Sequence, residues 1–349
     1  MAATADGQGA IFLSSTDFAL PKPIPQGLAK YVGFRDMAVG GTGRLRSCFD
    51  QITGRTVVIK TLQMRFILDK KEERRLLREA RVTAQLQHPN TVPVYEIGDD
   101  PKEGIYFAMK RVSGENLFQI LRRVATEEAD TAAGNTAAGN TAAGNTAAGN
   151  TAAEFPLYRR VAIVADAAQA LMYAHARGVI HRDVKPENIW VGNFGEVLLL
   201  DWGVAKVWGQ PDDMPLHPTV ARQQEHVQEL TMAGERPGTP LYMSPEQVNV
   251  NRAQVDERSD IFSVGVVLYE TAALREPFRG RVIQETFENI IHDTPMPPSE
   301  RSPEQGIPKA FDDVVMKAIA KTPTDRFQTM RQLLEALREV DFGPHSHGI

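Results

Sequence analysis

The sequence predicts an α+β fold in which a small β-rich part precedes a larger, mainly helical part. From Tyr31 to Leu62, short apolar runs broken by glycine are typical of strands, whereas apolar residues recur at helical spacing from Asn116 onward. The 349 residues are 42% hydrophobic and 24% charged, which is ordinary for a globular protein and excludes wholesale disorder. This division suggests two lobes with a cleft.

The β-rich part is predicted to contain several strands and one helix. Val57-Val58-Ile59 is a compact β-branched run of the kind found in buried strands. Lys70 to Leu86 places apolar residues on one face and charges elsewhere, which predicts a helix that stops at His88-Pro89-Asn90. Two further strands are expected at Val92–Gly98 and Ile105–Val112.

The rest of the chain is predicted to be mostly helical. Leu157 to Arg177 repeats apolar residues at helical spacing, and Gly178 stands where a helix C-cap would fall. Ile189 to Leu200 predicts a short hairpin that turns at Asn193–Gly195. Further helices are expected at Leu117–Val124, Asp260–Ala273, Phe311–Ala320 and Arg331–Val340.

Three segments fall outside this pattern. Residues 1–30 contain three closely spaced prolines and are predicted to form an N-terminal arm, and residues 341–349 a C-terminal tail. Residues 131–150 repeat Thr-Ala-Ala-Gly-Asn four times, and Thr-Ala-Ala follows. Because Gly and Asn recur in every repeat and no large apolar side chain is present, we predict a flexible surface insertion over 131–153.

Charge and cysteine content argue against several classes of protein. The 39 Lys and Arg residues against 44 Asp and Glu give a net charge of −5, which disfavours nucleic-acid binding through a basic surface. Cys48 alone can form neither an internal disulfide nor a cysteine zinc site, which fits a reducing compartment. No stretch approaches the ~18–20 apolar residues of a membrane helix, and no targeting segment is evident. We therefore expect a cytoplasmic protein, or the soluble part of a longer product.

Three motifs carry most of the chemical information. They are His181-Arg182-Asp183-Val184-Lys185-Pro186-Glu187-Asn188, then Asp201-Trp202-Gly203, and the segment from Gly238 to Glu246. Their order and spacing resemble the eukaryotic-type (Hanks-type) serine/threonine protein kinases of bacteria, in the subset that carries D-W-G. The resemblance implies a bilobal protein-kinase-like fold over residues 31–340, with a small lobe over 31–112 and a large lobe over 113–340.

The resemblance implies a role for each polar residue of the first two motifs. Asp183 would accept or orient the proton of a substrate hydroxyl, and Lys185 would contact the γ-phosphate of ATP, which favours Ser or Thr over Tyr. Asn188 and Asp201 offer the hard oxygen ligands that Mg²⁺ prefers. The expected cofactors are therefore ATP and Mg²⁺. Taken singly, these side chains would also fit ordinary turns.

An upstream set of residues is expected to hold the phosphates. By resemblance, Lys60 would pair with the α- and β-phosphates and be held by Glu79. The run from Ala38 to Leu45 aligns with the pattern G-x-G-x-x-G-x-V, although Ala38 replaces the first glycine. Glycines there let the backbone close over phosphates. The expected loop residues are Ala38, Val39, Gly40, Gly41, Thr42, Gly43 and Leu45.

The adenine pocket is expected to involve the segment after the last small-lobe strand. Met109, Lys110 and Val112 resemble the hinge, with Met109 as gatekeeper. Val58 would lie above the adenine ring and Trp190 below it, and both are larger than the residues that the family usually has there. These two enlargements would narrow the pocket.

The segment from Asp201 to Glu246 corresponds to the activation segment. Arg182 would bind a phosphate group on it through charge-assisted hydrogen bonds. Thr231 is the candidate autophosphorylation site, and Thr239 would shape the substrate site.

Two further residues of the large lobe have expected structural roles. Glu246 is expected to pair with Arg326, and Asp260 to brace the backbone of the catalytic loop.

These inferences favour an ATP-dependent serine/threonine protein kinase that acts on protein substrates and autophosphorylates. The alternative from another class is a pseudokinase that binds nucleotide or partners without turnover. Ala38, Trp190 and Val58 favour that alternative, whereas the complete set of catalytic residue types opposes it. A kinase of small molecules is a third hypothesis, against which the segment from Gly238 to Glu246 counts. Pairing into a homodimer is also compatible with the resemblance.

Overall fold

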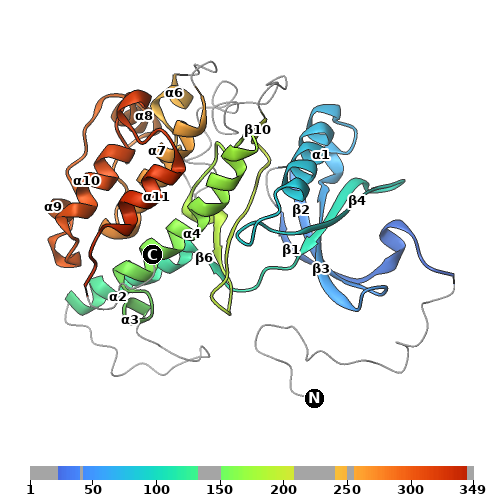
Figure 1. Ribbon diagram of the computed structural model, residues 1–349. Coiled ribbons are helices and arrows are strands. Elements are labelled where there is room, and N and C mark those ends of the chain that lie inside the picture. The colour runs from blue at the N-terminus through green and yellow to red at the C-terminus, as the bar shows by residue number, and fades with distance from the viewer. Residues whose placement is uncertain (1–22, 40–41, 133–150, 208–239, 250–254, 344–349) are drawn as a thin grey trace. The chain divides into compact units, whose positions relative to one another are not determined.

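The computed structural model describes residues 23–39, 42–132, 151–207, 240–249 and 255–343 (Figure 1). It divides into two compact units. The first comprises residues up to 114 together with 192–196 and 200–203, and the second comprises the remaining residues. The first unit therefore includes Asp201-Trp202-Gly203, which the predicted boundary between residues 112 and 113 had assigned to the large lobe.

A five-stranded antiparallel sheet in the order β1-β2-β3-β5-β4 forms the frame of the first unit. Its register places Leu45 opposite Lys60 and Val58 opposite Met109. The strands are β1 (Tyr31–Val39), β2 (Gly43–Asp50), β3 (Arg55–Leu62), β4 (Val94–Asp100) and β5 (Gly104–Lys110). The predicted strands are thus present, although β5 ends before Val112.

Helix α1 (Lys70–Gln85) packs against one face of this sheet. Its N-terminus is capped by the Asp69 carboxylate, which accepts the backbone N–H groups of Lys71 and Glu72. The buried contacts on this face come from Leu62, Leu76, Ala80 and Phe107. Since α1 also carries Glu79, this packing fixes the position of a predicted site residue against β3.

The opposite face of the sheet has a core of its own. It buries Tyr31, Cys48, Val57, Ile59, Tyr106 and Ala108. Leu28, from the 3₁₀ helix η1 (Gly27–Lys30), packs against them. A second short turn, η2 (Met64–Phe66), follows β3. The end of the predicted N-terminal arm is therefore part of the folded unit.

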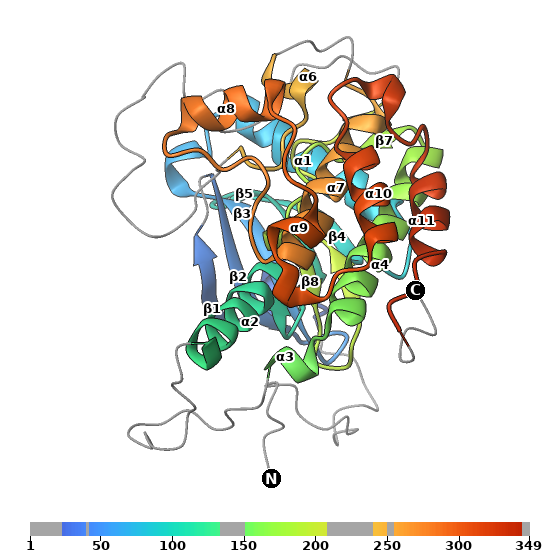
Figure 2. The ribbon, with the colours of Figure 1, turned by 90° about the vertical axis from the view of Figure 1, so that its left-hand side faces the viewer.

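The second unit is built around α4 (Leu157–Ala176) and α7 (Glu257–Ala273), which pack against each other (Figure 2). Almost every side chain of α7 is buried, as expected for a central helix. The other helices are α2 (Leu117–Ala132), α3 (Thr151–Glu154), α6 (Pro245–Val248), α8 (Ile283–His292), α9 (Pro298–Arg301), α10 (Lys309–Ala318) and α11 (Met330–Arg338), with short turns η5 (Pro303–Gln305) and η6 (Pro323–Asp325).

Short strands frame the loop that carries the strongest motif. β7 (Val179–Ile180) precedes the loop and pairs with β10 (Lys206–Val207). The turn η3 (Pro186–Asn188) leads into β8 (Ile189–Val191), which pairs with β6 (Glu115–Asn116) and β9 (Val197–Leu199). The predicted hairpin is confirmed, and residues 181–188 are anchored at both ends by strands.

The structure differs from the sequence prediction in several helical places. α2 continues to Ala132, well beyond the predicted end at Val124. α8 was not predicted. Thr151, assigned to a flexible insertion, begins α3 and is buried, and its hydroxyl donates to the Glu127 carboxylate. Residues 133–150 of the repeat lie outside the described residues.

Across the described ranges, no helix combines the length and the apolar character that a membrane crossing requires.

Candidate active site

The predicted pair of Lys60 and Glu79 is present in the first unit. The Lys60 Nζ lies 2.5 Å from the Glu79 Oε1. β3 supplies the lysine and α1 the glutamate, so the pair bridges the sheet and its helix. Both side chains are largely buried, which makes their interaction stronger than that of an exposed ion pair.

The charge state of this pair depends on a second carboxylate. Burial acts to lower the pKa of Lys60, but the charges of Glu79 and Asp201 outweigh it and raise that pKa above its usual value. Burial raises the pKa of Glu79, and the Lys60 ammonium opposes this change. The negative charges of Glu79 and Asp201 therefore favour the cationic form of Lys60.

The turn at Asp201-Trp202-Gly203 lies against α1. Asp201 has a φ of 62°, a left-handed conformation that non-glycine residues seldom adopt, although aspartate adopts it more readily than most. The Gly203 N–H donates to the Asp201 Oδ1 at 3.2 Å, and Trp202 is almost completely buried. A Cβ on Gly203 would come within 3.2 Å of the Glu79 Oε2, so only glycine fits easily here. The turn thus packs beside the carboxylate that holds Lys60.

The predicted phosphate loop is described only in part. Ala38 pairs with Leu45 between β1 and β2, and Thr42 accepts a backbone hydrogen bond from Gln63 at 2.8 Å. A Cβ on Gly43 would lie 3.3 Å from the Lys60 Cε, so this glycine closely approaches the lysine. Val39 is the last residue of β1, and Gly40 and Gly41 lie outside the described residues.

The predicted hinge residues lie at and after the end of β5. Met109 and Lys110 are its last residues, and Val112 follows it. Val58 on β3 is buried and lies opposite Met109. The Lys110 Nζ lies 3.6 Å from the Glu196 Oε1, a contact that the sequence did not predict.

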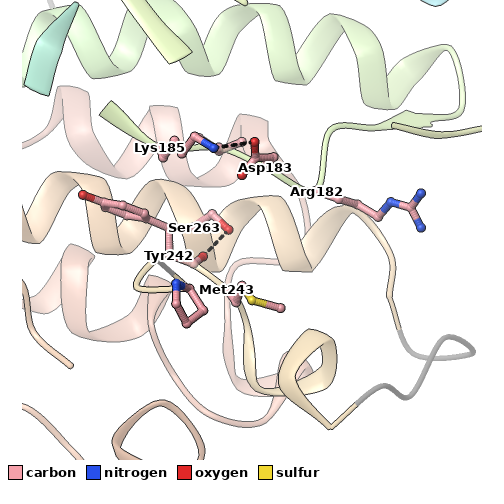
Figure 3. Close-up of a pocket in the computed structure, with 8 residues that line it drawn as sticks. Arg182, Asp183, Lys185, Tyr242, Met243 and Ser263 are labelled. Atoms are coloured by element: carbon pink, nitrogen blue, oxygen red, sulfur yellow. Dashed lines mark hydrogen bonds and ion pairs between the residues drawn. The ribbon is translucent and has the colours of Figure 1, made fainter. Parts of the chain in front are cut away.

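In the second unit, Asp183, Lys185 and Asn188 converge. The Lys185 Nζ lies 2.7 Å from the Asp183 Oδ2, as Figure 3 shows. The Asn188 Nδ2 donates to the Asp183 backbone oxygen at 2.8 Å and to its Oδ2 at 3.2 Å. The turn η3 brings Asn188 back toward the start of the loop. One carboxylate oxygen is therefore oriented by a cation and an amide.

Asp260 on α7 binds the backbone of the loop at residues 181–188, as predicted. Its Oδ2 accepts the His181 N–H at 2.8 Å, and its Oδ1 accepts the Arg182 N–H at 2.8 Å. The His175 Nε2 lies 2.7 Å from the Asp260 Oδ2. Arg182 has a φ of 68°, and the Gln247 side chain donates to its carbonyl at 2.9 Å. These bonds keep the loop in a conformation that is otherwise unfavourable.

A small cavity lies beside the catalytic-loop residues. Its volume is about 10 Å³, which is roughly the room for one water molecule. Tyr242 and Ser263 line it with Asp183, and the Ser263 hydroxyl donates to the Tyr242 carbonyl at 2.7 Å (Figure 3). The Tyr242 hydroxyl in turn donates to the Glu270 Oε2 at 2.5 Å. These bonds connect the segment at 240–244 to α7.

The predicted pair of Glu246 and Arg326 is present and buried. The Arg326 Nη1 and Nη2 donate to the two carboxylate oxygens of Glu246, each at 2.9 Å. The same guanidinium donates to the backbone oxygens of Ala320, Arg258 and Lys321. The pair joins the start of α6 to the chain after α10.

Two buried carboxylates make the second unit sensitive to acid. Burial raises the pKa of Asp260, but its bonds from His175 and His181 bring it below its usual value. Burial likewise raises the pKa of Glu246, and its bonds from Arg326 and Ser259 more than reverse this. Since both folded pKa values are depressed, the unfolded chain binds more protons in acid. Stability therefore falls as the pH falls.

We expect Asp260 and Glu246 to make their full contribution to the free energy of unfolding above about pH 5. This contribution should be lost as the pH drops through their folded pKa values, below about pH 4. Urea unfolding between pH 3 and 7 measures this. Asp260→Asn removes one of the two groups, so its stability should depend less steeply on pH in that acidic range. Identical slopes for the parent and Asp260→Asn would contradict the assignment.

Asn188 in the second unit and Asp201 in the first each offer an oxygen atom of the kind that Mg²⁺ prefers. The Asn188 amide nitrogen is already engaged with Asp183, which leaves its Oδ1 as the atom that would bind a cation. Mg²⁺ is typically bound by only a few protein oxygens, and it takes its remaining ligands from phosphates and water. In the part of the chain that is described, no cluster of three or more His, Cys, Asp or Glu could hold a metal by itself.

Some predicted residues are not placed, and some placed residues were not predicted. Thr231 and Thr239 lie outside the described residues. Trp190 lies in β8 of the second unit, paired with Asn116 and Leu198, whereas Val58 belongs to the first unit. The sequence analysis missed Gln247 and Arg75. Arg75 lies one helical turn before Glu79, so helical spacing alone could have placed it on the same face.

An antiparallel five-stranded sheet with one helix, followed by a helical unit with a strand-framed polar loop, is the architecture of the protein-kinase type of phosphotransferase. Residues 31–337 match the family model described as the protein kinase domain. The chain belongs to the protein kinase family.

The chain is similar to several bacterial kinases. Serine/threonine-protein kinase PknD of Protochlamydia amoebophila (strain UWE25) is 30% identical over 304 residues, which are 87% of this chain and 29% of that protein. PknD of Chlamydia trachomatis (serovar D) is 30% identical over 320 residues, which are 89% of this chain and 31% of that protein. Serine/threonine-protein kinase pkn3 of Myxococcus xanthus is 32% identical over 308 residues, which are 86% of this chain and 48% of that protein. The chain spans less than half the length of each.

Proposed function

We propose that this chain is an ATP-dependent serine/threonine protein kinase that transfers the γ-phosphoryl group of Mg-ATP to Ser or Thr residues of proteins. The observation that carries the proposal is the arrangement of Asp183, Lys185 and Asn188, whose polar atoms meet within 2.7–3.2 Å. Membership of the family and the Ser/Thr kinase names of the relatives support the same function.

The polar groups divide the reaction between them. The Asp183 carboxylate orients the substrate hydroxyl and accepts its proton as the oxygen bonds to the γ-phosphorus. The bond from that phosphorus to the β–γ bridging oxygen breaks, and ADP leaves. Lys185 stabilises the negative charge on the transferred group. Lys60, held by Glu79, positions the α- and β-phosphates.

Asn188 and Asp201 are proposed to hold Mg²⁺, which when bound neutralises charge on the phosphates. Ala38, Val39, Gly40, Gly41, Thr42, Gly43 and Leu45 are proposed to cover the phosphates. Met109, Lys110, Val112, Val58 and Trp190 are proposed to contact adenine. We further propose that residues 31–340 form a single protein kinase domain.

Regulation is proposed to act through the activation segment. Autophosphorylation at Thr231, recognised by Arg182, would order the segment, and Thr239 would shape the substrate site. A cytoplasmic location and pairing into a homodimer are further predictions from the sequence. The rival hypothesis of a pseudokinase rests on Ala38, Trp190 and Val58, but Lys60, Asp183 and Asp201 are residues that such a protein need not retain.

Lys60→Met is expected to lower the rate of phosphoryl transfer by about 10²–10³-fold, because the phosphates lose a positioned cation. Transfer from γ-labelled ATP to a mixed Ser/Thr peptide library, with Mg²⁺, measures the rate. The control is Lys71→Met, which removes an exposed lysine from the start of α1 and should behave as the parent does. A parent-like rate in Lys60→Met, at unchanged melting temperature, would contradict the proposed function.

A further inference from the structure

A second side chain of α1 reaches the turn that carries Asp201. The Arg75 Nε donates to the Gly203 backbone oxygen at 3.3 Å. Arg75 and Glu79 are four residues apart on α1, so they lie on the same face of the helix. All three residues belong to the first unit. The helix therefore contacts the turn through one residue and holds Lys60 through the other.

The contacts at Gly203 run directly to the carboxylate of Asp201. The Gly203 carbonyl accepts from Arg75, and the Gly203 N–H donates to the Asp201 Oδ1 at 3.2 Å. The Asp201 backbone is in a left-handed conformation that its surroundings must maintain. Fixing the carbonyl of Gly203 fixes the peptide group that follows Gly203 and so restricts the backbone at Gly203, whose N–H holds the Asp201 Oδ1. It thereby limits where the Asp201 side chain can go.

Two acidic side chains of α1 attract the Arg75 guanidinium. Its Nη1 lies 3.8 Å from the Glu72 Oε2, and the Glu72 side chain is largely buried. The Arg75 charge also acts on the buried Glu79 carboxylate, whose Oε2 lies close to Gly203. The 3.8 Å contact with Glu72 favours positions of the guanidinium from which Arg75 can donate to the turn.

We propose that Arg75 is a positioning residue for Mg²⁺ binding: its hydrogen bond to the Gly203 carbonyl holds the Asp201 carboxylate where the metal would be ligated. The proposal rests on the proposed kinase function for its catalytic consequence. Loss of the bond should raise the Mg²⁺ concentration required and lower kcat. The KM for Mg-ATP should rise with it, whereas the affinity for ATP in EDTA should stay within about twofold of the parent, because Arg75 is not proposed to touch nucleotide.

Two variants of nearly equal size separate the hydrogen bond from the charge. Arg75→Gln keeps an N–H donor at the position of the arginine Nε, whereas Arg75→Met has no donor there, and both lose the charge. We expect Arg75→Met to lower kcat by about 10-fold and Arg75→Gln to recover most of that loss. Arg74→Met is the matched control, since Arg74 is an exposed neighbour on the same helix and should leave kcat unchanged.

A binding measurement tests the same inference without turnover. The rise in melting temperature caused by a non-hydrolysable ATP analogue is measured in EDTA and then in Mg²⁺. Arg75→Met should keep the rise in EDTA and lose most of the additional rise in Mg²⁺, and Arg75→Gln should regain it. An unchanged Mg²⁺ increment in Arg75→Met, or equal losses in both variants, would overturn the inference. An inactive parent with the expected increments would instead count against the kinase function alone.

Discussion

Asp183→Asn is expected to lower phosphoryl transfer to a Ser/Thr peptide by about 10²–10⁴-fold, with little change in stability. The substitution keeps the shape of the side chain and one oxygen acceptor for Lys185 and Asn188, whose polar atoms lie 2.7 Å and 3.2 Å from the Asp183 Oδ2. It removes the carboxylate that would take the proton of the hydroxyl. Initial rates with γ-labelled ATP and Mg²⁺ measure the effect.

The matched control for this prediction is Asp313→Asn. Asp313 lies exposed on α10, so the same chemical change there should leave the rate unchanged. If Asp183→Asn transferred phosphate as fast as Asp313→Asn, Asp183 could not be the catalytic carboxylate. A melting temperature near that of the parent excludes unfolding as the cause of a lower rate.

Arg326→Met is expected to destabilise the protein by about 3–5 kcal/mol, the typical cost of removing one partner from a buried ion pair. Arg326 and Glu246 are only 2% and 4% exposed, so the glutamate would be left buried without its cation. Three backbone oxygens would also lose a donor. Urea unfolding at pH 7 measures the change in the free energy of unfolding.

A partly exposed ion pair offers the comparison for Arg326→Met. Arg258 pairs with Asp256 at 2.6 Å, and the two side chains are 25% and 30% exposed. Arg258→Met should therefore cost only about 0–1 kcal/mol. Equal losses in the two variants would mean that the Glu246 pair does not stabilise the second unit more than a surface pair does.

The residues that the sequence analysis identified correctly share a common property. Lys60 with Glu79, Glu246 with Arg326, and Asp260 with the loop backbone all pair a residue of a recognisable motif with a partner at a familiar position. The carboxylate of each pair is also buried, so the cost of leaving it without its partner constrains both positions together. The resemblance to the protein kinases, carried by these motifs, was sufficient to predict them.

The contacts that sequence reasoning missed depend on backbone groups or on packing. Arg75 donates to a carbonyl oxygen, and any residue type could supply that acceptor. The extension of α2 to Ala132 depends on tertiary contacts, because the Glu127 carboxylate accepts hydrogen bonds from Thr151 and Ala152. Local propensity in a Thr-Ala-Ala-Gly-Asn repeat gives no sign of such a partner, which lies 24 residues away.

The departures from the family pattern behave differently in the structure. Trp202, in place of the usual phenylalanine, is 1% exposed and is accommodated within the first unit. Val58 is buried in the sheet opposite Met109, while Trp190 belongs to β8 in the second unit. Their predicted joint effect on the adenine pocket stays a prediction, and the rate of Trp190→Ala relative to the parent would measure part of it.

The most direct test of the kinase function is autophosphorylation. The dephosphorylated chain is incubated with γ-labelled ATP and Mg²⁺ beside Asp183→Asn, and the modified residues are mapped by mass spectrometry. We predict label on Ser or Thr in the parent, with Thr231 among the sites, and none in the variant. No label in either chain, while nucleotide still raises the melting temperature, would contradict the proposed kinase activity. It would support a nucleotide-binding pseudokinase instead.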